Sequence, residues 1–365
     1  MTVRLATAAA ALATAALLAA AASAQSPEQQ QTVERSRALT PSGPWPEGDQ
    51  AGMGNTQGPG TWLRCAEHLS AEGARLYELS HERFNGMPQS PFGVPLIYEH
   101  RPTAGVPGSR HAFNGEQVVS GEPGAQGTQM DALGHFAELP EAWDGSEPFP
   151  SGEAVYYGGR PQDAVKPTPD SPLLALGIEQ APPIVTSALL LDAAAHLNGG
   201  EPLEPGAMVT AADVEAMIEA QGLGWRGVLP GDVVLIHTGW GRLWDDPEAA
   251  GRYYAMGPGL ARDAAEMLAE KQVVLVALDN PFTDPVAEGQ LRGEAPPPQG
   301  AEDGLPFVVH HLNLAVNGVH NIQNARLDEL AADRVWTSCA MILPLRSRGA
   351  SGSPVRAVAV GAPGR

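Results

Sequence analysis

The side chains best suited to chemistry gather in a ten-residue stretch, from Gly127 to Phe136. Gln129, Asp131 and His135 offer an amide, a carboxylate and an imidazole close together. Because Asp131 and His135 are four residues apart, they can face one centre in a helix or in a turn. Zinc and manganese take such groups as ligands. A buried Asp–His hydrogen bond in an ordinary loop would use the same two residues, so the spacing leaves both interpretations open.

A second polar cluster lies near the other end of the chain. His310 and His311 are adjacent, and His320 and Gln323 follow shortly after them. Neighbouring side chains of an extended segment point to opposite sides, so at most one histidine of the pair is expected in a given site. Polar clusters so far apart in sequence are typical of a site assembled on loops at the ends of strands.

Apolar patterns predict the elements that must position these clusters. Ile184 to Asp192 is a long apolar run that indicates a buried strand, and Thr210 with Asp213 forms a helix-start signature. The alternation of helices and strands after residue 205 indicates an α/β architecture. Residues 86–107 are expected to be loop-rich. We expect helices over 61–76, 211–221 and 260–268, and strands over 76–80, 184–192, 232–238, 273–278, 335–345 and 355–360.

The beginning of the chain is expected to be a secretory signal peptide, residues 1–24. Arg4 gives a positive start, residues 5–23 contain only Ala, Leu, Thr and Ser, and residues 22–24 match a small-x-small cleavage pattern. The protein is therefore expected in a periplasm or outside the cell. Residues 25–60 are rich in Gln, Pro, Gly and Ser and predict an extended or partly disordered arm. A single catalytic domain is expected over 61–363.

The net charge of the chain excludes some classes of binding partner. The 365 residues include 22 basic and 42 acidic side chains, a formal net charge of −20. Such a surface repels nucleic acid and anionic lipid, so neither nucleic acid nor a membrane is expected as a partner. The sequence has no phosphate loop and no Gly-x-Gly-x-x-Gly pattern that opens a helix after a strand, which argues against a nucleotide-dependent enzyme. A small-molecule substrate is expected instead.

The chain has two cysteines, Cys65 and Cys339. An exported protein could join them, but the sequence does not fix their separation in space, so their state stays open. A zinc site of four cysteines is excluded by their number. A site of two cysteines and two histidines lacks the usual close spacing of ligands.

The stretch around Asp131 resembles the signature of the cyclase family of metal-dependent hydrolases, the group that contains bacterial kynurenine formamidase (arylformamidase) and isatin hydrolase. The family pattern is His-x-Gly-Thr-His-x-Asp-x-Pro-x-His, and residues 125–135 read Ala-Gln-Gly-Thr-Gln-Met-Asp-Ala-Leu-Gly-His. The resemblance covers roughly residues 49–360. It implies the swivelling β/β/α fold and a homo-oligomer, a dimer or a tetramer. Further similar segments are Leu79-Ser80-His81, Gly86-Met87-Pro88, Pro230-Gly231-Asp232, Thr238-Gly239-Trp240, Leu278-Asp279-Asn280-Pro281 and Gly352-Ser353-Pro354.

The resemblance implies roles for residues of this chain. Asp131 matches the family's metal-binding aspartate and His135 its acid/base histidine, whereas Ala125 and Gln129 replace two histidine ligands. Leu133 replaces the signature proline, so the loop is expected to run differently.

Members with two metals add a histidine and, twelve residues later, a glutamate. His311 matches the histidine, and Gln323 stands in place of the glutamate. With these changes one divalent cation is expected, held by Asp131, Gln129, His311 and Gln323. Manganese, zinc and calcium are candidates, and oxygen ligands favour manganese or calcium.

The implied reaction is hydrolysis of a small formamide, cyclic amide or lactone, with His135 moving the proton of a cation-bound water. His81 and Trp240 are candidate walls of the substrate pocket. Two alternatives stay open. The replaced ligands would suit an exported, non-catalytic relative that binds a small molecule. A metal-independent hydrolase could use Asp131 and His135 as an acid/base pair.

Overall fold

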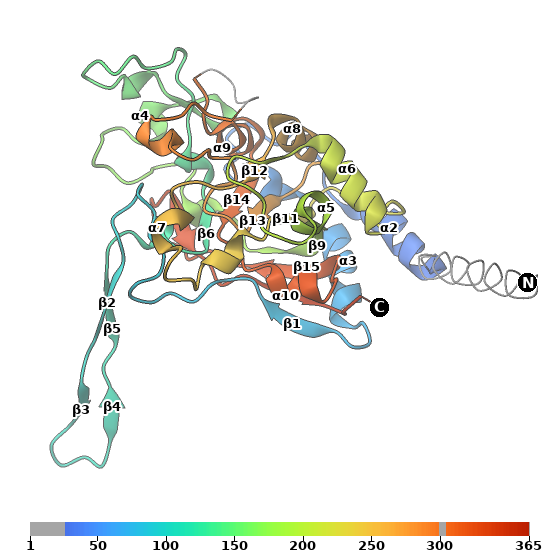
Figure 1. The fold of residues 1–365 in the computed structure, drawn as a ribbon, viewed down its shortest axis with the longest axis horizontal. Coiled ribbons are helices and arrows are strands. Elements are labelled where there is room, and N and C mark those ends of the chain that lie inside the picture. The colour runs from blue at the N-terminus through green and yellow to red at the C-terminus, as the bar shows by residue number, and fades with distance from the viewer. Residues whose placement is uncertain (1–25, 299–303, 365) are drawn as a thin grey trace, which may run out of the picture.

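Nine strands form one mixed sheet through the middle of the protein (Figure 1). This computed structural model describes residues 26–298 and 304–364. In spatial order the strands are β1 (Arg75–Glu78), β17 (Val358–Gly361), β15 (Thr337–Ile342), β9 (Ile184–Asp192), β11 (Val233–His237), β13 (Leu275–Leu278), β14 (His320–Gln323), β6 (Gln129–Asp131) and β16 (Gly352–Pro354). The expected α/β class, in one domain, is confirmed.

Four neighbouring strands at the centre of the sheet, β9, β11, β13 and β14, run parallel. Their side chains are almost all buried, because elements cover both faces, as is usual for parallel strands. Helices α6 (Ala211–Ala220) and α8 (Arg262–Glu270) pack on one face. Helix α10 (Asp328–Ala332) packs on the other. The strand expected over 184–192 and the helix expected to start after Thr210 are confirmed.

Short elements complete the described chain. The helices among them are α4 (Gln162–Val165), α5 (Ala193–Asn198), α7 (Ala250–Tyr253) and α9 (Val308–His310). Two small strand pairs are β7 (Val155–Tyr156) with β8 (Arg160–Pro161), and β10 (Met208–Val209) with β12 (Gly259–Leu260).

The segment before the sheet differs from its expectation. The predicted extended arm over 25–60 contains helix α2 (Pro27–Leu39), which packs against α3 (Pro59–Leu69). A capping box explains this start, because the Ser26 hydroxyl accepts from the Gln29 amide and the Gln29 side chain accepts from the Ser26 amide. Composition alone therefore misjudged a segment that is capped and buried on one side. The predicted signal peptide, residues 1–24, lies outside the described residues.

A long hairpin interrupts the segment that was expected to be loop-rich. It consists of β2 (Ile97–His100) paired with β5 (Gln117–Ser120), and of β3 (Thr103–Gly105) paired with β4 (Ala112–Asn114). The hairpin projects far from the sheet (Figure 1). Among the described residues, no helix is both long and apolar enough to cross a membrane.

A disulfide joins Cys65 in α3 to Cys339 in β15 across 274 residues of sequence. Such a cross-link stabilises a fold mainly by restricting the unfolded chain. Replacing both cysteines with serine is expected to lower the free energy of unfolding by roughly 2–5 kcal/mol. Urea unfolding of the two proteins measures the difference, and an unchanged midpoint would contradict it.

His237 ends β11 inside a cluster of carboxylates. Its Nδ1 lies 2.8 Å from Oδ1 of Asp192 and its Nε2 lies 3.2 Å from Oδ1 of Asp328. Burial lowers the pKa of His237, but these two hydrogen bonds outweigh burial and raise the pKa to about 10. The charged ring therefore ties α10, through Asp328, to the carboxyl ends of β9 and β11.

Replacing His237 with glutamine is expected to destabilise the protein most at neutral and acidic pH. An unfolded histidine has a pKa of about 6.5, so the contribution of the charged ring is complete below that pH. The contribution is lost as the pH rises through the folded pKa of about 10. We expect a cost of roughly 2–4 kcal/mol at pH 6. Urea unfolding of both proteins from pH 6 to 10 should show a shrinking difference, whereas a constant difference would show that the charge of His237 does not matter.

Candidate metal centre

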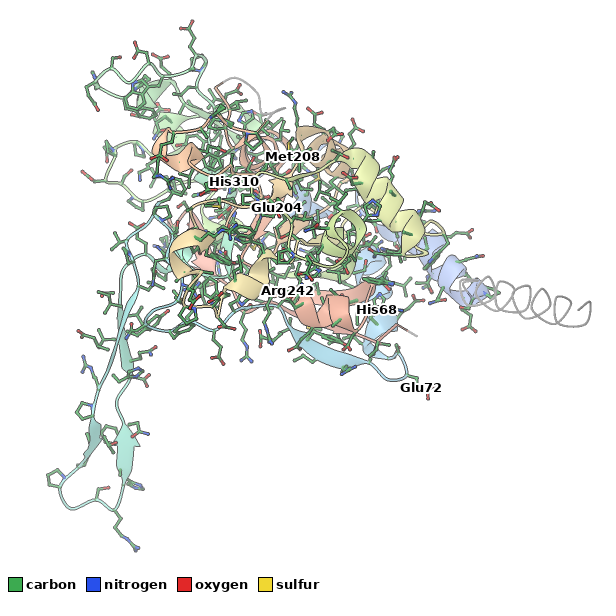
Figure 2. The ribbon with its side chains drawn as sticks, viewed as in Figure 1. His68, Glu72, Glu204, Met208, Arg242 and His310 are labelled. Carbon is green, nitrogen blue, oxygen red and sulfur yellow. A yellow bond between two sulfur atoms is a disulfide. The ribbon has the colours of Figure 1, made fainter. Side chains whose placement is uncertain are left out.

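Three side chains from separate elements converge beside the sheet. Asp131 ends β6, His135 ends the 3-10 turn that follows, and His310 ends α9. One ligand atom from each lies within 4.8 Å of the other two. Asp131 and His310 are buried, whereas His135 is exposed. Figure 2 shows His310 within the densely packed body, away from the projecting hairpin.

The local backbone explains how Asp131 and His135 reach one place. Strand β6 pairs with β14 on one side and β16 on the other, which fixes the direction of Asp131. The chain then turns tightly, with the His135 amide donating to the Ala132 carbonyl at 2.9 Å. A Cβ at Gly134 would lie 2.9 Å from Leu173 Cδ1. Glycine therefore allows the turn that carries His135 toward Asp131.

His310 is held by a second buried carboxylate, Asp284. The Asp284 Oδ2 lies 2.6 Å from Nδ1 of His310, and its two oxygens also accept from the backbone amides of Val309 and His310. On the other side of the ring, Nε2 lies 3.5 Å from Oδ2 of Asp131 and 3.0 Å from Nε2 of Gln323. A carboxylate on Nδ1 orients a histidine ring and leaves Nε2 as the atom that faces the centre.

Charge sets the protonation of the three groups. Burial raises the pKa of Asp131, but the nearby His135 and His310 outweigh burial and hold this pKa below its ordinary value. Burial also lowers the pKa of His310, yet hydrogen bonds to Asp131 and Asp284 outweigh this and raise the pKa to about 9. A cation that binds Nε2 of His310 must displace this proton. The pKa of His135 is lowered by loss of hydration and by the charge of His310, against the attraction of Asp131.

Two amide oxygens extend the set of donor atoms. Gln129 and Asp131 lie two positions apart on β6 and point to the same face, and Gln323 pairs with Gln129 across the sheet. The Oε1 atoms of Gln129 and Gln323 are buried and have no hydrogen-bond partner among the described residues. Buried oxygens of this kind need a partner. The Asp131 carboxylate, the His310 imidazole and these two oxygens suit a single divalent cation, with His135 beside it.

The structure corrects one predicted ligand, because His310 and not His311 faces Asp131. His311 begins a π-helix, His311–Asn317, whose i→i+5 hydrogen bonds widen the turn. The twelve-residue spacing that selected His311 assumes a regular backbone up to Gln323. In the structure the preceding histidine, His310, takes the place in the cluster.

His311 lines a neighbouring cavity of about 560 Å³. Its Nδ1 is buried there without a hydrogen-bond partner among the described residues. Phe136 and Phe307 line the same cavity and also border the cluster, with ring centres 4.9 and 6.1 Å from that of His310. An apolar cavity beside exposed His135 is where a small molecule could meet the three side chains.

The two predicted pocket walls lie elsewhere. Trp240 is 2% exposed in an aromatic core, and its indole N–H donates to the Tyr253 carbonyl. His81 stacks on Trp244 and lines a different cavity, whose lining residues include none of the three clustered side chains. Both residues follow strands in sequence, but the pattern did not reveal which side of the sheet their side chains would occupy.

The sequence reasoning missed His310 as a member of the cluster and missed Asp284 altogether. Asp284 lies in a loop six residues after β13, a parallel strand. Loops at the carboxyl ends of parallel strands commonly carry functional side chains, and this was the available signal for Asp284.

Comparison with known proteins agrees with this architecture. A crystal structure described as a novel cyclase is 23% identical, with a TM-score of 0.69 over 89% of this chain and 98% of that one. Isatin hydrolase A from Ralstonia solanacearum is 21% identical, with a TM-score of 0.52 over 81% of this chain and 95% of that one. An isatin hydrolase bound to the product analogue thioisatinate is 19% identical, with the same TM-score and the same coverage. No curated protein matches the chain.

These likenesses confirm the fold expected from the sequence, the swivelling β/β/α fold. The family model "Cyclase: Putative cyclase" matches residues 77–285, more than half of the chain. The matched region contains Asp131 and His135, and also Asp284. The chain therefore belongs to the cyclase family.

Proposed function

We propose that this protein hydrolyses the carbonyl–nitrogen or carbonyl–oxygen bond of a small formamide, cyclic amide or lactone, with an arylformamidase-like reaction. The convergence of Asp131, His135 and His310 within 4.8 Å carries the proposal. The aromatic cavity beside them supports it, because Phe136 and Phe307 provide flat apolar walls. The cavity's two carboxylates, Glu138 and Glu141, disfavour an anionic substrate.

A single divalent cation fits the donor atoms. Asp131 and His310 would hold it, together with the unpartnered oxygens of Gln129 and Gln323. The bound ion would polarise a carbonyl and make a water more acidic. Manganese and calcium suit the oxygen donors, and zinc suits the imidazole.

The proton is moved by His135 in this proposal. An imidazole with an ordinary pKa of about 6.5 is mostly neutral at pH 7, so His135 can take a proton from the attacking water and give it to the leaving nitrogen or oxygen. Its exposed position lets it reach a substrate in the cavity. Asp284 keeps the His310 ring in one orientation, and the Phe136 ring packs beside both histidines.

Replacing His135 with alanine is expected to reduce turnover by roughly 10²–10⁴-fold, the usual contribution of a general acid/base. Binding of the cation and the unfolding midpoint should change little, because the exposed ring contributes little to the core. The His196→Ala variant is a matched control, since His196 is exposed on α5. Unchanged turnover in His135→Ala, measured with the substrate of the wild type, would remove His135 from the mechanism.

One observation favours a second candidate, a non-catalytic relative that binds a small molecule. The Gln323 amide donates to Oδ2 of Asp131 at 2.5 Å and so occupies a ligand atom. A screen of formyl-anilides, cyclic amides and lactones, with manganese, zinc or calcium added, separates the two functions. Hydrolysis that depends on the cation supports the hydrolase. Binding of these compounds without turnover under every condition supports the relative.

Export and assembly belong to the same proposal. The Cys65–Cys339 disulfide supports a periplasmic or secreted location, because such bonds persist in oxidising compartments. The strongly acidic chain supports a small molecule as the substrate, without nucleic acid or membrane as partners. A homo-oligomer is also proposed, as the family resemblance implies.

A further inference from the structure

The cavity that His311 lines, beside the metal cluster, contains a buried polar atom without a partner. His311 is 6% exposed, and its Nδ1 has no hydrogen-bond partner among the described residues. A buried ring nitrogen of this kind needs a partner. Because His311 lines the cavity of about 560 Å³, a molecule bound there can supply that partner. The cavity therefore suits a ligand that has a polar group at its buried end.

Aromatic rings form much of the wall of this cavity. Phe136 and Phe307 line it close to His310, and Trp143 lines it with a side chain that is 44% exposed. A flat ring that packs on such side chains buries apolar surface and loses no hydrogen bond. A protonated amine is also attracted to the face of an aromatic ring, most strongly to that of tryptophan. The walls thus suit an aryl compound that carries a positive charge.

Carboxylates supply the fixed charge at the cavity. Glu138 and Glu141 line it and are exposed, and no lysine or arginine of the described chain lines it. Neither carboxylate forms a salt bridge within residues 26–298 and 304–364. The whole segment 136–159 carries five acidic side chains and no lysine or arginine. A cleft lined by one sign of charge concentrates ligands of the opposite sign.

We propose that the cavity selects a cationic aryl compound, a small amide or lactone whose aromatic ring carries a protonated amine and no carboxylate. The ring packs on Phe136 and Phe307, and the amine lies beside Glu138 and Glu141. A polar substituent on the ring pairs with Nδ1 of His311. This inference rests on the proposed hydrolase function and names the substrate class of that same site.

A divalent cation that enters the metal centre is the other ion that the two carboxylates could attract. The aromatic walls favour an organic cation, because a hydrated metal ion gains no apolar contact from them. The unpartnered nitrogen of His311 also lies in the same cavity as the carboxylates, so one organic molecule can reach both. The two occupants differ in which affinity the carboxylates control.

Binding of three anilines to the full chain, with manganese added, tests the proposal without any need for hydrolysis. At neutral pH 3-(aminomethyl)aniline carries a positive charge, 3-ethylaniline has the same shape without a charge, and 3-aminobenzoate is an anion. Titration calorimetry should rank their affinities in that order. We expect the amine to bind roughly 10-fold more tightly than 3-ethylaniline, and the difference to shrink at high salt.

Glu138→Gln combined with Glu141→Gln removes both charges and keeps the shape of the side chains. This variant should bind the amine no more tightly than 3-ethylaniline, while its affinities for 3-ethylaniline and manganese stay unchanged. The matched control, Glu99→Gln with Glu116→Gln, changes two exposed positions on the projecting hairpin and should keep the wild-type preference. In nitrogen NMR the His311 signal, assigned by its absence in His311→Phe, should move when the amine is added.

Equal binding of the amine and 3-ethylaniline by the wild type would overturn the proposal, as would a His311 signal that does not move. A double variant that keeps the preference but loses affinity for manganese would also overturn it and assign the carboxylates to the metal ion. Selective binding without hydrolysis of the matching formamide would keep the cationic ligand and remove the hydrolase. Hydrolysis of formanilide without any preference for the amine would do the reverse.

Discussion

Replacing Asp131 with asparagine is expected to abolish tight cation binding and to reduce turnover by roughly 10³-fold or more. Asparagine keeps the shape of the side chain and can still accept from Gln323, but it carries no charge. A neutral amide is a much weaker ligand for a divalent ion than a carboxylate. The charged His310 ring would also lose one of the two carboxylates that it pairs with, and only Asp284 would remain. Metal titration and steady-state kinetics measure the two effects.

The control for this variant is Asp170→Asn, an exposed position far from the cluster in sequence. It should match the wild type in both measurements. If Asp131→Asn kept the affinity for the cation and the turnover of the wild type, the cluster would have no part in the reaction.

Replacing Asp284 with asparagine is expected to weaken cation binding roughly 10–100-fold, as removal of a ligand's partner usually does. The asparagine oxygen can still accept the hydrogen bond from the Val309 amide. The NH₂ group of the asparagine then faces Nδ1 of His310. The ring must accept there, and its proton moves to Nε2, the atom that faces Asp131. A histidine in that tautomer must first give up the Nε2 proton before it binds a cation there, which weakens binding, and turnover should fall by about 10²–10⁴-fold.

The tautomer is visible directly by nitrogen NMR of histidine-labelled protein. In the cation-bound wild type, His310 should carry its proton on Nδ1, and in Asp284→Asn the signal should report a proton on Nε2. The Asp144→Asn variant, at an exposed turn, is the control and should keep the wild-type pattern. Loss of stability alone would not move the proton, so an unchanged tautomer in Asp284→Asn would contradict the positioning role.

The sheet could be predicted from the sequence because its central strands carry an unambiguous pattern. Ile184 to Asp192 is apolar enough to be buried on both faces, and the capping box at Thr210 marks the start of α6. Such local signals do not depend on distant contacts. The short strand β6 could not be recognised from pattern, since three residues give no period.

The cluster could be predicted only in part, for a reason of geometry. Asp131 and His135 lie on one tight turn, so their sequence spacing is close to their spatial relation. His310 comes from a separate segment, and the sequence does not say which of two adjacent histidines points inward. Asp284 acts through His310 and not on the centre itself, so no ligand pattern includes it. The projecting hairpin, residues 97–120, was missed because nearly all of its residues are exposed and so give no pattern of buried positions.

The most direct test of the proposed centre is the metal content of the dialysed wild type, measured together with hydrolysis before and after chelation. The proposal predicts one equivalent of a divalent metal per chain, loss of hydrolysis with the chelator, and recovery when the metal is returned. The Asp131→Asn protein should hold none. The central claim would be contradicted if a wild type that contains no metal showed full hydrolysis and the chelator had no effect on it. Asp131 and His310 would then act in the reaction without a cation.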